Sequence, residues 1–101
     1  MSLAGSVVAI TGASAGIGRA CALAFGARGA RVVVGARRLE LLDTLVAELL
    51  SRGGDAMALS LDVGERDQVE AFVKAAVERY GRLDVLVNNA GYGVRGTVAA
   101  T

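Results

Sequence analysis

The chain has 101 residues, enough for one small domain with a single core. Hydrophobic residues make up 53% of it and aromatic residues 4%, so the apolar content is mostly aliphatic, which suits a parallel sheet buried on both faces. The 11 basic and 10 acidic residues leave a net charge of +1. This balance gives no electrostatic footprint for a nucleic acid or an anionic membrane surface, and we expect neither partner.

Apolar runs and helical periodicities alternate along the chain. β-branched and aliphatic runs predict buried strands at 7–10, 31–35, 56–61 and 85–87. Between them, apolar spacing predicts helices over about 17–28, 39–52 and 65–79, which end at Gly29, Gly53 and Gly81. This order predicts an α/β fold: one Rossmann-type domain over 1–101, with a doubly wound parallel sheet in the strand order 3-2-1-4.

The same spacing assigns an inward face to each predicted helix. The first helix is expected to bury Ile17, Ala20, Cys21, Ala24 and Phe25, the second Leu42, Leu45, Val46 and Leu49, and the third Val69, Phe72, Val73, Ala76 and Val77. Glu40, Asp43 and Glu48 are expected on the outer side of the second helix.

Cys21 is the one cysteine, and it cannot form an intrachain disulfide. We interpret it as a small core residue in a reducing compartment. A reactive thiol is the alternative, but the chain contains no histidine that could activate it. The N-terminus lacks the basic region of a signal peptide, and no apolar run reaches the length of a membrane span. These features predict a soluble cytoplasmic protein.

A glycine-rich turn follows the first predicted strand and precedes the first helix. Glycines at 12, 16 and 18 permit a tight turn and let a ligand approach bare backbone, while the N–H groups that open the helix attract an anion. The expected ligand is a pyrophosphate. The alternative is a turn between two buried elements that binds nothing.

The end of the second predicted strand selects the dinucleotide. An acidic residue there binds the adenosine ribose hydroxyls of NAD, but this chain has the neutral Ala36, followed by Arg37 and Arg38. Guanidinium groups suit a 2′-phosphate, so the sequence predicts NADP rather than NAD, with Arg37 the stronger candidate contact. Ordinary surface arginines are the alternative, although cations are disfavoured at the start of a helix unless an anion offsets them.

Two further segments follow strand ends, and all four are expected to meet at one crevice beyond the sheet. Asp62 could hydrogen-bond an adenine amino group or cap the next helix, and both readings stay open. Asn88 and Asn89 carry several donors and acceptors that a simple turn does not need. We interpret them as support for the glycine turn and as a contact for the nicotinamide-side ribose.

Together these motifs closely resemble the simple, non-extended branch of the short-chain dehydrogenase/reductase family. The matching segments are 11–18 (TGASAGIG), 35–38 (GARR), 62–63 (DV), 83–87 (LDVLV) and 88–91 (NNAG). The resemblance implies that the cofactor phosphates and ribose lie along Gly12, Ser14, Ile17 and Gly18, the 2′-phosphate at Arg37, the adenine at Asp62 and Val63, and the nicotinamide ribose near Asn89, Ala90 and Gly91. It also implies that Thr11 ties the glycine turn to the 88–91 segment.

One part of the family pattern is missing. Its members transfer hydride with a serine and a Tyr-x-x-x-Lys pair, and neither Tyr80 nor Tyr92 has the lysine. We assign no catalytic residue and no metal ligand in these 101 residues. The sequence predicts the cofactor-binding, N-terminal half of an NADP-dependent oxidoreductase for a carbonyl or secondary alcohol, and the resemblance implies a homo-oligomer. The alternative is a catalytically silent dinucleotide-binding or interaction module. We also expect an open edge strand, because later strands of the family are absent.

Overall fold

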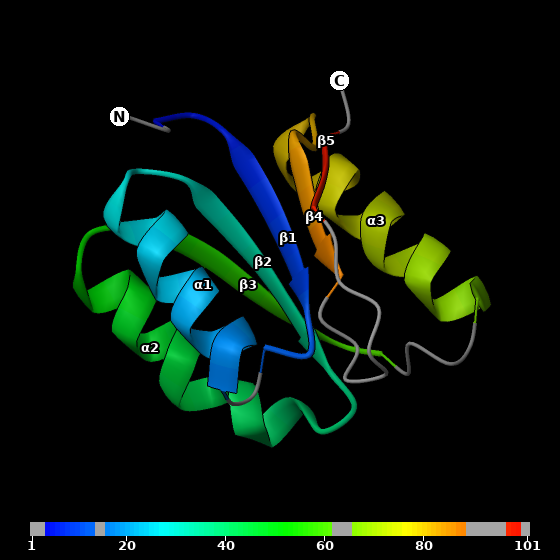
Figure 1. Ribbon diagram of the computed structural model, residues 1–101, viewed down its shortest axis with the longest axis horizontal. Helices are drawn as coiled ribbons and strands as arrows, with labels where there is room; N and C mark the ends of the chain where they lie inside the picture. Colours follow the sequence, from blue (N-terminus) through cyan, green and yellow to red (C-terminus); the bar gives the residue numbers. More distant parts are fainter. Residues whose placement is uncertain (1–3, 14–15, 62–65, 89–96, 100–101) are drawn as a thin grey trace.

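The computed structural model describes residues 4–13, 16–61, 66–88 and 97–99. The elements in chain order are β1 (Val7–Thr11), α1 (Gly16–Ala27), β2 (Arg31–Ala36), the 3₁₀ helix η1 (Leu39–Leu42), α2 (Asp43–Ser51), β3 (Asp55–Ser60), α3 (Arg66–Tyr80), β4 (Val85–Asn88) and β5 (Thr97–Ala99). The strands form one sheet in the order β3-β2-β1-β4-β5 (Figure 1). Strands β1 to β4 are parallel, which confirms the predicted order 3-2-1-4.

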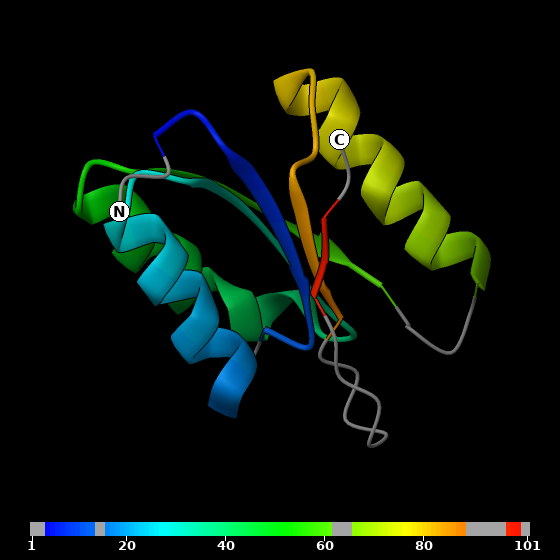
Figure 2. The same cartoon turned by 45° about the horizontal axis from the view of Figure 1, so that its top comes forward.

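Helices cover both faces of the sheet. Helices α1 and α2 lie on one face and α3 lies on the other, as the tilted view shows (Figure 2). Alternate residues of β1 serve the two faces: Val8 and Ile10 pack toward α1 and α2, whereas Val7 and Ala9 pack toward α3. All four side chains are fully buried, as expected for a central parallel strand. No helix in the described part of the chain is long and apolar enough to span a membrane.

The inward face of α1 differs from the prediction. Gly18 and Ala22 are buried and Cys21 and Phe25 are partly buried against the core, whereas Ile17 is 70% exposed and Ala20 and Ala24 are also exposed. The buried stripe is therefore rotated by about one residue. The reason is that the smallest side chains face the sheet and let α1 approach closely, while alanine tolerates either face.

The second predicted helix is divided into two parts. Residues 39–42 form the 3₁₀ turn and residues 43–51 form α2. Leu42, Leu45 and Leu49 are buried as predicted, because the turn keeps all three on the sheet side. Glu48 was predicted on the outer side, but it lies against α1, where Arg19 provides a counter-ion. A spacing argument within one helix cannot detect a partner on another helix.

Two further differences lie in the second half of the chain. Val77 of α3 is 41% exposed, although it was predicted to face inward, because Phe72 and Ala76 occupy the buried part of that face. Strand β5 was not predicted, since three residues carry no recognisable period. It pairs antiparallel with β4, so the edge strands of the described sheet are β3 and β5.

Candidate functional site

The carboxyl ends of the parallel strands lie at one edge of the sheet. Thr11 of β1 is in register with Gly35 of β2 on one side and with Asn88 of β4 on the other. Ala36 is in register with Ser60 of β3. The segments that follow all four strands therefore begin at the same edge, and the order in which the strands are added reverses between β1 and β4. Ligands of open α/β sheets bind at this place.

Two glycines on either side of the turn after β1 have left-handed backbone conformations. Gly12 has φ +64° and Gly16 has φ +61°. Residues other than glycine rarely adopt such positive values. The N–H of Ala13 donates to the carbonyl of Gly35 at 3.1 Å, which ties the turn to the end of β2. A Cβ added to Gly16 would meet nothing within 4 Å, so the space in front of this residue is open.

The first turn of α1 carries no negative side chain that would neutralise the helix dipole. Gly18 is buried and brings the helix close to the sheet, whereas Ile17 presents an exposed apolar side chain beside the turn. The structure thus places the start of α1 beside open space and an exposed apolar side chain, and the N-terminal end of a helix attracts an anion.

The segment after β2 carries the two arginines, and they are not equivalent. The Nε of Arg38 donates to Oε1 of Glu40 at 2.9 Å. A backbone hydrogen bond and then Arg38 lower the pKa of the Glu40 carboxyl. Arg37 is exposed, and its side chain has no ion-pair partner in the described ranges 4–13, 16–61, 66–88 and 97–99. Its carbonyl accepts from Ser60 Oγ at 3.1 Å, which anchors the backbone.

Gly35 lies near the end of β2 and closely faces Leu61 and Phe72 on the α3 side of the sheet. A Cβ there would collide with Leu61 Cδ2 and come within 2.9 Å of the Phe72 ring. The sequence identified Gly35 as the end of a strand and as part of the 35–38 segment that resembles the family, but not as a packing position. Its signal was a glycine inside an otherwise β-branched run, which often marks a close approach of other groups.

Several predicted site residues lie outside the described residues. These are Ser14, Asp62, Val63, Asn89, Ala90 and Gly91. Both interpretations of Asp62 therefore stay open. Cys21 is a free, half-buried thiol packed against the core, in agreement with a small core residue. Among the residues that the structure describes, no cluster of histidine, cysteine, aspartate or glutamate could hold a metal ion.

A parallel sheet of order 3-2-1-4, with helices on both faces and a glycine turn at its switch point, is the arrangement of the doubly wound, Rossmann-type class of α/β folds. The chain belongs to the short-chain dehydrogenase family, whose family model matches residues 6–101.

Curated relatives agree with this assignment. The chain is 44% identical over 90 residues to a 3-oxoacyl-(acyl-carrier-protein) reductase of Synechocystis sp., which covers 88% of this chain and 36% of the relative. It is 47% identical over 91 residues to the 3-oxoacyl-(acyl-carrier-protein) reductase FabG of Thermotoga maritima, covering 90% of this chain and 37% of that one.

Solved structures show the same fold. A metagenomic short-chain oxidoreductase in complex with NADP superposes with a TM-score of 0.86 and 45% identity, covering 92% of this chain and 42% of that structure. The hydroxysteroid dehydrogenase from Escherichia coli gives a TM-score of 0.82 and 36% identity, covering 86% and 36%. The chain therefore spans well under half the length of these relatives.

Proposed function

We propose that the protein is an NADP-dependent oxidoreductase and that these 101 residues form its cofactor-binding part. The observation that carries the proposal is the pairing of a neutral Ala36 with an exposed Arg37 at the end of β2. NAD would need a carboxylate at this position, whereas the 2′-phosphate of NADP needs a cation. The NADP complex of the metagenomic relative supports the same cofactor.

The remaining contacts follow the order of the site. The phosphates would lie along the glycine turn and the start of α1, the 2′-phosphate at the arginines, the adenine after β3 and the nicotinamide ribose after β4. The residues proposed to bind are Gly12, Ser14, Gly16, Ile17, Gly18, Arg37, Arg38, Asp62, Val63, Asn89, Ala90 and Gly91. Arg38 would contribute less than Arg37, because Glu40 already neutralises it.

When bound, NADPH supplies a hydride for reduction of a carbonyl, and NADP accepts one from a secondary alcohol. The described residues bind and orient the dinucleotide. The Tyr-x-x-x-Lys pair that would move the proton does not occur in these 101 residues. We therefore assign hydride transfer to the whole protein, acting in the cytoplasm as a homo-oligomer on a small carbonyl or alcohol, and we expect this stretch alone to be inactive.

A second candidate is a catalytically silent dinucleotide-binding module, because the described residues form the cofactor-binding half of the fold. Oxidation of NADPH with a panel of aldehydes, ketones and 3-oxoacyl thioesters separates the two. Turnover by the protein from its complete gene supports the oxidoreductase. Tight NADP binding without any turnover supports the silent module.

The proposed cofactor is tested by equilibrium binding. Dissociation constants of NADP and NAD are measured by calorimetry on one preparation, and NADP is expected to bind more tightly. Equal affinity for both, or tighter binding of NAD, would contradict the role assigned to Arg37.

A further inference from the structure

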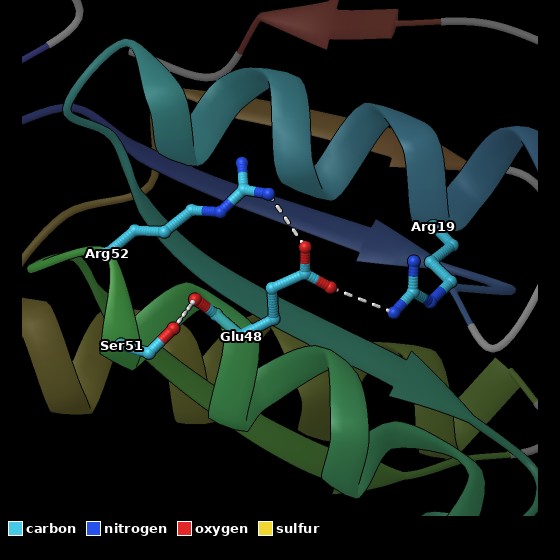
Figure 3. Close-up of polar contacts among 4 residues, drawn as sticks. All are labelled: Arg19, Glu48, Ser51 and Arg52. Atoms are coloured by element: carbon cyan, nitrogen blue, oxygen red, sulfur yellow. Dashed lines mark hydrogen bonds and ion pairs between the residues drawn. The ribbon is translucent and has the colours of Figure 1, made fainter.

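The two helices on one face of the sheet are joined by a charged link. Glu48 of α2 uses both carboxylate oxygens: Oε1 accepts from Nη2 of Arg19 at 3.0 Å, and Oε2 accepts from Nη2 of Arg52 at 2.7 Å (Figure 3). Arg19 lies in the first turn of α1, whereas Arg52 directly follows α2. The Arg19 and Glu48 side chains are only 37% and 31% exposed, so their pair is partly shielded from solvent.

A second contact joins the same helices further along. A Cβ added to Gly26 would come within 2.5 Å of Leu49 Cδ2, so α1 and α2 approach closely there. Arg19 and Gly26 are seven residues apart, which is about 10 Å along the axis of α1. Helix α1 also packs on the sheet through its buried Gly18 and Ala22. The two contacts at different heights add to this packing and constrain the distance and the angle between α1 and α2.

Each of these helices leads to a different part of the candidate site. Helix α1 begins at Gly16, inside the turn proposed to bind the pyrophosphate. Helix α2 follows η1, which begins directly after Arg37 and Arg38. A ligand that contacts both parts depends on the spacing between the helices. A ligand that contacts only one part does not.

We propose that Glu48 is a positioning residue for NADP: through Arg19 it sets the spacing between the pyrophosphate-binding turn and the 2′-phosphate-binding Arg37. This inference rests on the proposed function. Glu48 acts through the two helices and does not touch the cofactor.

Charge and geometry predict opposite effects when Glu48 is neutralised. Loss of its negative charge makes the region more positive, which on electrostatic grounds tightens the binding of an anionic ligand. Loss of the link to Arg19 loosens the spacing and weakens a ligand that spans the site. If a ligand that spans the site binds more weakly when Glu48 is neutralised, the cause is therefore the changed spacing and not the changed charge.

Three probes separate the parts of the site. ADP carries the pyrophosphate, adenosine 2′-monophosphate carries the 2′-phosphate, and 2′-phospho-ADP-ribose carries both. Their dissociation constants are measured by calorimetry in the protein from its complete gene. In Glu48→Gln, 2′-phospho-ADP-ribose should bind roughly fivefold more weakly, while the two partial probes should change less than about twofold, since coupling in an ion-pair network is of this size.

Two further variants make the test specific. Arg52→Gln breaks the other ion pair of the same carboxylate and keeps the link between the helices, so it should leave the spanning probe within about twofold of wild type. Arg19→Gln breaks the link from the other side, and its ratio of spanning probe to ADP should fall as in Glu48→Gln. The Arg19→Gln variant also replaces Glu48→Gln in the test if Glu48→Gln does not fold.

Three results would count against the proposal. An equal loss for all three probes means that Glu48 only supports folding. Unchanged binding of the spanning probe in Glu48→Gln and Arg19→Gln means that the link does not set the spacing. A wild-type protein that binds none of the probes contradicts the proposed function itself, and the inference with it, so the two failures are distinguishable.

Discussion

The carboxylate of Asp84 accepts a hydrogen bond from the backbone N–H of Val7 at 2.8 Å, although 77 positions separate the two residues. The N–H of Asp84 in turn donates to the carbonyl of Val7 at 2.9 Å. Arg82 holds the same carboxylate through two nitrogens. The start of the central strand β1 is thus fastened to the segment that leads into β4.

Replacement of Asp84 by asparagine should destabilise the fold and remove an acid-sensitive step. Arg82, and then the Val7 N–H, lower the pKa of the Asp84 carboxyl below its ordinary value. A depressed folded-state pKa means that the stabilisation is present above the unfolded value, about pH 4, and is lost as the pH falls through the folded value. The melting temperature of wild type should therefore fall more steeply than that of Asp84→Asn between about pH 5 and pH 2.

The control for this prediction is Arg82→Gln, which keeps the Val7 hydrogen bond and removes the larger cause of the pKa shift. In Arg82→Gln, the melting temperature should depend less steeply on pH than in wild type but more steeply than in Asp84→Asn. Parallel acid profiles for wild type and Asp84→Asn would show that this carboxyl does not contribute.

Gly35→Ala should destabilise the domain by about 1–3 kcal/mol, the usual cost of overpacking a core. Its Cβ has no space, because Leu61 and Phe72 already occupy that position. Urea unfolding measures the effect. If the clash is the cause, the double variant Gly35→Ala/Leu61→Val should lose less than the sum of its single variants. Full stability of Gly35→Ala would show that α3 adjusts freely.

Ala36→Asp combined with Arg37→Gln should reverse the cofactor preference. The new carboxylate suits the ribose hydroxyls of NAD and repels a 2′-phosphate, while the arginine that would bind this phosphate is gone. The measured quantity is the ratio of the dissociation constants for NADP and NAD. Arg38→Gln is the matched control and should change the ratio less, because Arg38 is paired with Glu40. An unchanged ratio in the double variant contradicts the role of Arg37.

Tyr80→Phe should cost about 0.5 kcal/mol or less at neutral pH, because it removes one exposed hydrogen bond and keeps the ring. The hydroxyl donates to Asp55 Oδ1 at 3.1 Å, and the ring lies 5.6 Å from the guanidinium carbons of Arg31 and Arg79. Tyr80→Ala removes the ring as well and should cost more. Urea unfolding of both variants separates the hydroxyl from the ring.

Ionisation of Tyr80 at alkaline pH should lower the free energy of unfolding. Burial raises the pKa of the Tyr80 phenol. Its contribution is therefore complete below the unfolded value, about pH 10, and is lost as the pH rises through the folded value. Tyr80→Phe should not show this loss. Identical alkaline profiles for wild type and Tyr80→Phe would assign the loss to other groups.

Strand order and helix positions could be predicted because they follow local patterns. The β-branched runs and the glycines that end helices are read within a few residues, and the alternation of elements then limits the topology. The face of α1 and the place of Glu48 could not be predicted this way. The face of α1 depends on how closely the helix approaches the sheet at Gly18, and the place of Glu48 depends on how closely α1 and α2 approach at Gly26; both are settled only in three dimensions.

The candidate site was predicted in part for a similar reason. Its residues follow strand ends, so their shared edge follows from the parallel sheet. The sequence made Arg37 the stronger candidate contact for the 2′-phosphate. The structure adds that Arg38 forms an ion pair with Glu40, which is a separate reason to expect less from Arg38. The predicted contacts of Asp62, Val63, Asn89, Ala90 and Gly91 stay predictions, because they lie outside the described residues.

The central position of β1 has a consequence for synthesis on the ribosome. This strand is made before the other described strands, and β2 can pair with one of its edges once Ala36 has emerged. Its other edge waits for β4, whose first residue, Val85, comes 49 positions later. At ordinary translation rates of about 5–20 residues per second, this edge stays unpaired for roughly 2–10 s. The nascent chain therefore passes through a stage in which an apolar strand is open to chaperones and to neighbouring chains.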